Sequence, residues 1–327
     1  MHQYPKVYAF DEKTGYKGIP NIEGYIRRPG IENRFKLNAF GFNDRNFPVE
    51  HPDSIFRIIV VGSSLVEGTW SHQRETFVSL LHKKFQAAGY HAEVMNCAMS
   101  GSERGLQNLA YYKESTQRFR PNLVLYEFSM PLISSNYTRG SYLDYSILYA
   151  GENLKELSHS QFVAQKRVDL VKRHKFITDL YDLCYCMRVI CRQYFEGNHW
   201  GTVANCCKVY AENKSDSWQY FSMDVLGLRK SITLVNDFAD TVKRMDARVL
   251  AFEYGSGYAE NLHDSSLTTK FPLLSLGLDL GDEYRLSLDG HFNLLGDSVV
   301  ADALFSRLKE YIPGEFHPNS GKRPNNN

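Results

Sequence analysis

The segment RIIVVGSSLVEG, residues 57–68, constrains the fold more than any other part of this sequence. A short apolar run that ends at a glycine, here Ile58 to Val61 followed by Gly62, is typical of a buried parallel strand in an α/β sheet. Open sheets of this kind place ligands and reacting groups at the carboxyl ends of their strands. Ser64 follows the strand among small residues, and it is therefore a candidate nucleophile.

Strand and helix patterns alternate along much of the chain. We expect strands at 57–62, 91–96, 123–128, 248–254 and 274–280, and helices at 75–89, 105–118, 226–245 and 296–311. Such alternation requires right-handed crossover connections, which place the strands parallel in one sheet. The sequence therefore predicts a three-layer α/β fold of the flavodoxin-like type, with a central parallel sheet of about five strands and helices on both faces.

Three segments lie outside this alternation. Residues 1–55 hold many Gly, Pro, Asn and charged residues and are predicted to form an extended arm over the core. Residues 132–222 are an insertion, expected to be mostly helical between 162 and 195. Residues 313–327, which end in GKRPNNN, are expected to be disordered. The sequence thus predicts one domain over 56–312 that carries a helical insertion.

Composition excludes several classes of partner. Hydrophobic residues make up 43% and charged residues 23%, as in a soluble protein with a sizeable core. The net charge of +1 argues against a nucleic-acid or anionic-membrane partner. No stretch approaches the ~18 apolar residues of a membrane span, and the N-terminus, MHQYPKVYAF, lacks the pattern of a secretory signal. We expect a cytoplasmic protein, or a periplasmic or membrane-anchored one if an N-terminal segment is missing. Nothing in the sequence predicts the oligomeric state.

Metal and nucleotide sites are also disfavoured. Five of the six cysteines fall between Cys184 and Cys207, near His199, but their C-x-C and C-C spacings differ from the paired C-x-x-C of structural zinc sites. Small buried hydrophobic residues are the favoured interpretation of this cluster. Residues 62–67 contain neither G-x-G-x-x-G nor a P-loop lysine, which argues against a nucleotide-binding domain. We therefore expect no metal and no organic cofactor.

A nucleophilic serine needs a base, an orienting acid and donors for the oxyanion. His291 precedes the last predicted helix, and Asp289 is close enough in sequence to reach it in a turn. Gly101 follows the second strand, so its backbone N–H and that of Ser64 are candidate oxyanion donors at one sheet edge. The alternative interpretation makes Asp289 a turn cap, His291 a surface residue and Gly101 part of an ordinary turn.

Together these segments resemble the SGNH (GDSL-type) hydrolases. GSSLVEG, 62–68, is similar to the GDSxxxG nucleophile block, and NCAMSG, 96–101, to the NxxxxG block. DGHFNLLG, 289–296, resembles the Asp-x-His variant of the last block, as in bacterial alginate O-acetyltransferase relatives. The segment LNAFGFNDRNF resembles the Asn-x-x-Gly-Phe lead-in of many bacterial members. The resemblance covers roughly 37–131 and 226–311.

This resemblance implies the SGNH fold and a catalytic apparatus without cofactor. It implies that Ser64 is the nucleophile, His291 the base and Asp289 the acid that orients it, with backbone N–H groups of Ser64 and Gly101 in the oxyanion hole. The reaction implied is that of a serine esterase or O-acyltransferase acting on a small, acetyl-like acyl ester of a carbohydrate or lipid.

Two departures from the family pattern affect the site. Ser63 stands where the family has Asp, a position that supports the loop. The third block normally ends in Gly-x-Asn-Asp, and its oxyanion-donating Asn aligns with Pro131, which has no donor. Asn136 lies five residues further on and is a candidate substitute. Losing one oxyanion donor typically lowers turnover by about 100- to 1000-fold.

The proline leaves a second interpretation open, in which the chain is a catalytically degenerate member that binds a glycan or protein partner. The insertion is also open to two interpretations. Its closely spaced tyrosines either line a sugar or acyl pocket or, as the favoured alternative, pack the insertion against the sheet: Tyr137, Tyr142, Tyr145 and Tyr149.

Overall fold

The computed structural model describes residues 7–11, 14–28, 31–50, 52–100, 111–128, 140–142, 145–147, 225–255, 269–286 and 289–318. The chain divides into two compact units, Met1–Thr138 with Val225–Asn327, and Arg139–Asp224. In the second unit the described elements are β8 (Gly140–Tyr142) and β9 (Tyr145–Ile147), which pair antiparallel. The helices expected at 162–195 and the cysteines between 184 and 207 lie outside the described residues.

The first unit contains a five-stranded sheet in the order β11-β10-β7-β5-β6. The bounds of its strands are β5 (Phe56–Val61), β6 (Ala92–Asn96), β7 (Leu123–Glu127), β10 (Arg248–Glu253) and β11 (Leu273–Ser275). All four neighbouring pairs are parallel. Every residue of β5 and β7 is buried, as expected for strands covered on both faces. The predicted parallel sheet is therefore confirmed.

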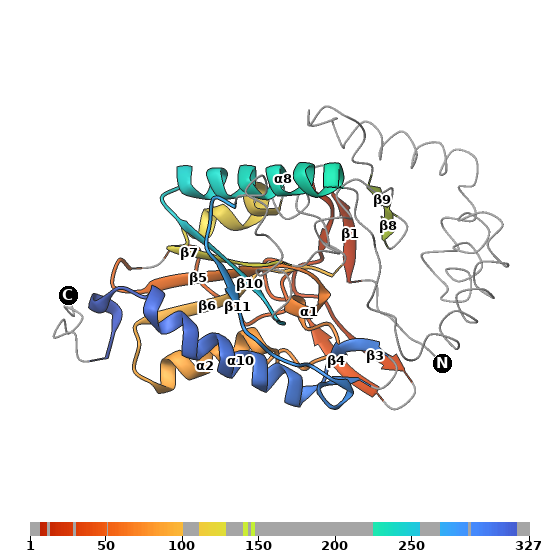
Figure 1. Ribbon diagram of the computed structural model, residues 1–327. Coiled ribbons are helices and arrows are strands. Elements are labelled where there is room, and N and C mark those ends of the chain that lie inside the picture. The colour runs from red at the N-terminus through yellow and green to blue at the C-terminus, as the bar shows by residue number, and fades with distance from the viewer. Residues whose placement is uncertain are drawn as a thin grey trace. The chain divides into compact units, whose positions relative to one another are not determined.

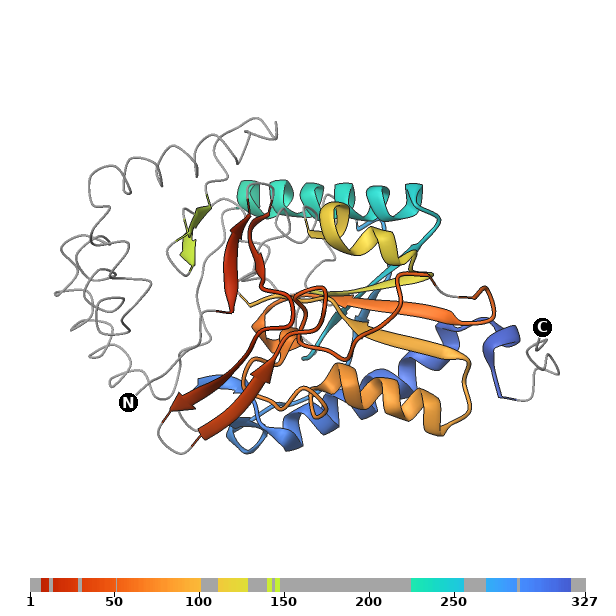
Figure 2. The same cartoon turned by 180° about the vertical axis from the view of Figure 1, so that it is seen from behind.

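Helices cover both faces of this sheet. On one face lie α2 (Phe77–Ala87) and α10 (Leu294–Leu308), and on the other lies α8 (Val225–Arg244), as Figure 1 shows. Seen from behind, the short helical turns η1 (Tyr112–Thr116) and η2 (Gln117–Phe119) lie beside α8 (Figure 2). The predicted three layers are confirmed. No helix of the described stretches is long and apolar enough to cross a membrane.

The helix expected at 105–118 has a different form where it is described. From Tyr112 it is a π turn followed by a 3-10 turn, and Arg120 ends it in the left-handed region at φ 48°. These turns lead directly into β7, and Phe119 is fully buried at their end.

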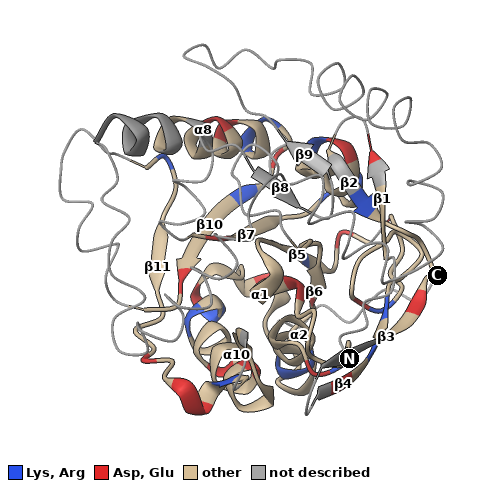
Figure 3. Cartoon of the chain, turned by 90° about the vertical axis from the view of Figure 1, so that its right-hand side faces the viewer, with Lys and Arg blue, Asp and Glu red and all other residues tan. Residues whose placement is uncertain are grey.

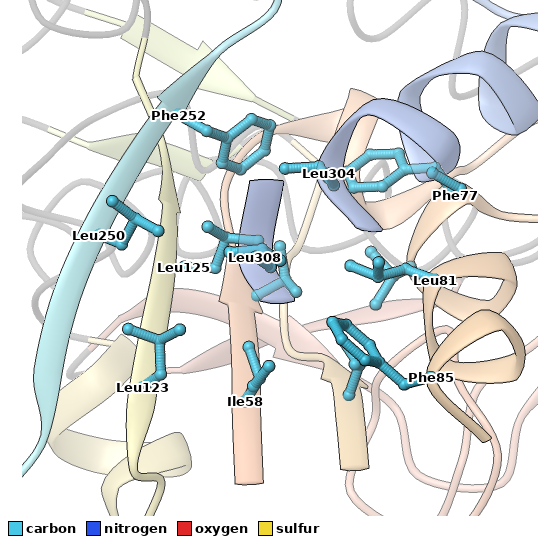
Figure 4. Packing of buried hydrophobic residues seen from close by; sticks show 14 of the residues in the cluster. Ile58, Phe77, Leu81, Phe85, Leu123, Leu125, Leu250, Phe252, Leu304 and Leu308 are labelled. Carbon is cyan, nitrogen blue, oxygen red and sulfur yellow. The ribbon is translucent and has the colours of Figure 1, made fainter. Parts of the chain in front are cut away.

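One apolar core packs α2 and α10 against the sheet (Figure 4). It joins side chains of the central strands to those of α2 and α10, among them Ile58, Leu123, Leu125, Leu250, Phe252, Phe77, Leu81, Phe85, Leu304 and Leu308. Each buried Leu, Ile or Phe contributes roughly 1.5–3 kcal/mol relative to an exposed one. The strand ends that carry the site are thus anchored on a rigid base.

The N-terminal arm contains more regular structure than expected. It holds two antiparallel hairpins, β1 (Tyr8–Asp11) with β2 (Gly15–Gly18), and β3 (Glu23–Arg28) with β4 (Ile31–Lys36). Two-stranded hairpins bury few side chains, so their sequences show little apolar alternation and were not predicted. Further along, Phe47 packs against Phe119 with ring centroids 5.1 Å apart, which fixes this part of the arm on the core.

The C-terminal segment is described to Pro318, inside the region expected to be disordered. It forms a 3-10 turn, η6 (Gly314–Phe316). Phe316 packs against Phe56, with ring centroids 5.3 Å apart, and its carbonyl accepts the His91 N–H at 2.9 Å. Phe316 thus anchors this turn on β5.

Candidate active site

The turn after β5 presents Ser64 at the carboxyl edge of the sheet. Figure 3 looks onto this edge, with α1 (Ser64–Glu67) following β5. Ser63 is the N-cap of α1, and its Oγ accepts the Leu65 N–H at 3.2 Å. Gly68 ends the helix in the left-handed conformation, φ 67°. Serine caps a helix about as well as aspartate, so Ser63 supports the start of α1.

His291 reaches this turn from a distant part of the chain. It lies on β13 (Asp289–Phe292), which pairs antiparallel with β12 (Arg285–Leu286). Its Nε2 atom lies 2.7 Å from Ser64 Oγ, a hydrogen-bonding distance between residues 227 apart in sequence. Asn293 caps the following α10, with its Oδ1 accepting the Gly296 N–H at 3.0 Å. His291 is thus held between a strand pair and a helix.

Three expectations about the site need separate comment. The backbone from Asp289 to His291 is a strand and not the expected turn, because β12 pairs with it. The Asp289 side chain lies outside the described part of the chain. Gly101 and Asn136 also lie outside it, so their oxyanion roles stay predictions, and Pro131, which offers no donor, lies outside it as well.

Two buried asparagines satisfy the free carbonyls of α1. Asn43 Nδ2 donates to the Glu67 carbonyl at 2.8 Å, and Asn96 Nδ2 donates to the Val66 carbonyl at 2.8 Å. The Asn96 backbone N–H donates to Asp44 Oδ2 at 2.7 Å. Burial raises the pKa of Asp44 to about 6, against the lowering effect of Arg45. The arm residues Asn43 and Asp44 therefore help to shape the turn that carries Ser64.

A second buried carboxylate lies one turn after the serine. Glu67 Oε1 accepts the Tyr8 hydroxyl at 2.5 Å, and Oε2 accepts the Thr69 hydroxyl at 2.7 Å. Burial raises the pKa of Glu67, and hydrogen bonds from Ser100, Tyr8 and Thr69 oppose that rise. Glu67 therefore connects the first strand of the arm to α1 and to the end of the NCAMSG segment.

A narrow hollow opens beside the Ser64–His291 pair. Its lining combines small, apolar and polar side chains: Ser64, Leu65, Gly68, Thr69, Trp70, Ser71, His291, Phe292 and Asp297. The Trp70 ring meets the His291 ring edge to face, with centroids 6.3 Å apart. Asp297 accepts hydrogen bonds from the Ser71 hydroxyl and, at 2.9 Å, from the Phe77 N–H. The loop between α1 and α2 is thereby fastened to α10.

Sequence reasoning did not identify Asn43, Glu67, Trp70 or Asp297 as parts of this site. A weak signal in the sequence was available for two of them, since Glu67 and Asp297 are acidic residues within otherwise apolar segments, VEGTW and LLGDSVV. Buried carboxylates must be hydrogen-bonded or neutral, so such positions mark polar networks. Their partners come from distant segments and could not be predicted from spacing.

No metal-ligand set occurs among the described residues, where no group of three or more His, Cys, Asp or Glu side chains could hold an ion. Cys97 is a free thiol, and burial raises its pKa well above the ordinary value. A buried thiol of this kind behaves as a small hydrophobic residue.

No protein-family model and no curated protein sequence matches this chain. Among solved structures it is similar to TesA, at 12% identity and a TM-score of 0.42, over 78% of this chain and 99% of that chain. It is also similar to the psychrotrophic esterase EstA from Pseudoalteromonas sp., at 12% identity and a TM-score of 0.43, over 78% and 98% of the two chains. A GDSL-like lipase from Bacteroides thetaiotaomicron matches at 10% identity and 0.38, over 81% and 93%. The function proposed below rests on this chain's own residues.

Proposed function

We propose that this chain is a serine ester hydrolase or O-acyltransferase of the SGNH type, with Ser64 as nucleophile and His291 as general base. The observation that carries the proposal is the 2.7 Å separation of Ser64 Oγ and His291 Nε2. A serine hydroxyl is a weak nucleophile until a neighbouring base takes its proton. The order of the GSSLVEG, NCAMSG and DGHFNLLG segments supports the same assignment.

The reaction proceeds in two halves. Ser64 Oγ attacks the acyl carbonyl carbon while its proton passes to His291 Nε2, and the carbonyl electrons move onto oxygen. The oxyanion collapses, the ester C–O bond breaks, and His291 returns the proton to the departing alcohol. Water or a second hydroxyl then attacks the acyl-serine by the same route. In this proposal Asp289 orients His291, and the N–H groups of Ser64 and Gly101, with Asn136 as a further donor, stabilise the oxyanion.

We place the substrate among small acyl esters of carbohydrates or lipids. Leu65, Trp70 and Phe292 line the hollow beside Ser64, so the surroundings of the proposed nucleophile are partly apolar. Incubation with acetyl-ester donor and free sugar separates the two activities, because a hydrolase releases acetate and a transferase forms a new sugar ester.

The direct test is labelling with a fluorophosphonate, which forms a phosphorus–oxygen bond to an activated serine and releases fluoride. We expect labelling of the full chain at Ser64, lost in Ser64→Ala and strongly reduced in His291→Ala. Turnover of short-chain p-nitrophenyl esters should disappear with the label, while the melting temperature of both variants stays close to that of the unaltered protein. Wild-type rates in either variant would refute the assignment.

The second candidate is a binding protein without turnover, and Pro131 at the position of the oxyanion Asn favours it. If a folded sample shows no fluorophosphonate labelling of Ser64 at any pH tested, the enzyme hypothesis is rejected in favour of the binding protein. Binding to a glycan array would then be the next measurement.

A further inference from the structure

A buried carboxylate outside the proposed triad holds the residue that precedes the nucleophile. Glu127 is the last residue of β7 and is only 1% exposed. Its Oε2 accepts the backbone N–H of Ser63 at 2.6 Å. Since β7 pairs directly with β5, the carboxylate reaches across neighbouring strand ends onto the turn that carries Ser64.

The turn has space for this carboxylate because position 62 is glycine. A Cβ atom at Gly62 would lie 2.6 Å from Glu127 Oε2 and 2.7 Å from Glu127 Cβ, closer than Cβ atoms approach in real structures. Val66 Cγ2 of α1 would lie 2.5 Å from the same Cβ, so any side chain at 62 would displace Glu127 or the turn. The Glu127 side chain therefore occupies space that is free only because residue 62 has no side chain.

Glu127 is also connected to the side of the site that carries the histidine. Tyr254 directly follows β10, the other neighbour of β7. Burial raises the pKa of the Tyr254 hydroxyl well above its ordinary value, and the nearby Glu127 charge raises it further. The Tyr254 ring packs edge to face on Phe292, with centroids 5.1 Å apart, and Phe292 follows His291 in the chain. Contacts at the ends of β7 and β10 thus connect the turn that carries Ser64 to β13, the strand that carries His291.

We propose that Glu127 is a positioning residue that fixes the Ser63–Ser64 peptide so that Ser64 Oγ meets His291 Nε2; this inference rests on the proposed function. Ser63 is held twice, through its N–H by Glu127 and through its Oγ by the Leu65 N–H. Ser64 therefore starts α1 with little freedom to rotate away. Rates of acyl transfer are very sensitive to such placement, and a displacement of about 1 Å can cost about 100-fold.

The test compares two replacements of Glu127 in the full chain. Glu127→Gln retains a carbonyl oxygen that can accept the Ser63 N–H, whereas Glu127→Leu keeps a comparable volume and removes the acceptor. We expect kcat of Glu127→Leu to fall by roughly 100-fold with little change in KM, and Glu127→Gln to stay within about 10-fold of the wild type. The second-order rate of fluorophosphonate labelling should follow kcat. Rates are expressed per serine labelled at completion, so that misfolded molecules do not count.

The matched control is Glu253, which ends the adjacent strand β10 and is 2% exposed. Glu253→Leu removes an equally buried carboxylate, and its kcat should remain near the wild-type value. If Glu127→Leu does not fold, judged by circular dichroism and melting, Glu127→Met replaces it, since its flexible side chain also lacks an acceptor of comparable strength. The comparison with Glu127→Gln is otherwise unchanged.

Equal rates in Glu127→Gln and in the variant without an acceptor would overturn the positioning role, whether both are fast or both are slow. The role would likewise be refuted if Glu253→Leu lost as much activity as Glu127→Leu. The failure of the proposed function looks different, because the wild type itself would then show no turnover or labelling dependent on Ser64.

Discussion

The Asp297 carboxylate in α10 accepts the backbone N–H of Phe77, the first residue of α2, at 2.9 Å. The contact joins two helices that cover the same face of the sheet. It also lies beside the hollow that contains Ser64 and His291. Burial raises the pKa of Asp297 from 3.8 to about 7, even though hydrogen bonds from Ser71 and Phe77 favour its ionised form.

This pKa predicts a stability that depends on pH. Between about pH 4 and pH 7 the folded protein keeps a proton on Asp297 that the unfolded chain has released. The stability from this group is therefore greatest below about pH 4 and is lost as the pH rises through 7. Asp297→Asn keeps the neutral form at every pH, so it should gain on the order of 2–4 kcal/mol relative to the wild type between pH 5 and pH 8. Urea unfolding at both pH values measures the difference. Asp302→Asn, an exposed aspartate of the same helix, is the control, and an equal change in both variants would contradict the prediction.

Ester turnover should rise with pH, because a general base accepts the Ser64 proton only in its neutral form. Initial rates with a short-chain p-nitrophenyl ester between about pH 5 and pH 8 measure this profile. The pKa of Asp44 is raised to about 6 by burial, so it titrates in the same interval. Asp44→Asn separates the two groups. A rate independent of pH in both the wild type and this variant would exclude general-base catalysis by His291.

Removing the Tyr8 hydroxyl should destabilise the protein. Its hydrogen bond to Glu67 Oε1 is buried and reaches a carboxylate, so Tyr8→Phe should lower the free energy of unfolding by about 1–3 kcal/mol. Tyr25→Phe is the matched control, since Tyr25 is 46% exposed on the second hairpin. Denaturant midpoints of the two variants provide the comparison. Equal midpoints would mean that the Tyr8 bond contributes nothing to folding.

Gly68→Ala should impair both stability and turnover. Gly68 has φ 67°, and a Cβ there would lie 2.4 Å from Thr76 Cγ2. The strain of the left-handed conformation costs an alanine about 1–2 kcal/mol, and the close contact adds to it by moving the end of α1. Gly277→Ala isolates the strain, because φ is 63° there and no atom lies within 4 Å of the new Cβ. Both variants should melt below the wild type, Gly68→Ala further, and only Gly68→Ala should lose ester turnover. Identical losses in both would show that the contact with Thr76 is unimportant.

The sheet and its covering helices could be predicted because the signals are local. Apolar runs such as IIVV and LVLY require burial on both faces, and helical spacing reveals the inward side of α2 and α10. The bounds of α8 and β10 lie within a residue or so of those expected. The hairpins of the arm gave no comparable signal, because two-stranded hairpins bury few side chains and show little apolar alternation.

The proximity of Ser64 and His291 could be predicted only by considering the two residues together with the order of the strands. Neither residue is distinctive alone, yet a serine after the first strand and a histidine before the last helix fall at one sheet edge. The supporting groups could not be found in this way. Asn43 and Glu127 act through contacts with backbone atoms of a turn far away in sequence, and such contacts leave no pattern in spacing.

The contacts of Asn43, Asp44 and Tyr8 have a consequence for dissecting this protein. A shortened chain that starts at Phe56 would retain every strand of the sheet, yet a carbonyl of α1, the Glu67 carboxylate and the Asn96 N–H would each lose a partner. Buried polar groups left in that state oppose folding. The smallest piece able to fold with an intact turn at Ser64 therefore includes the arm from Tyr8 to Asp44, however loosely its sequence resembles a domain.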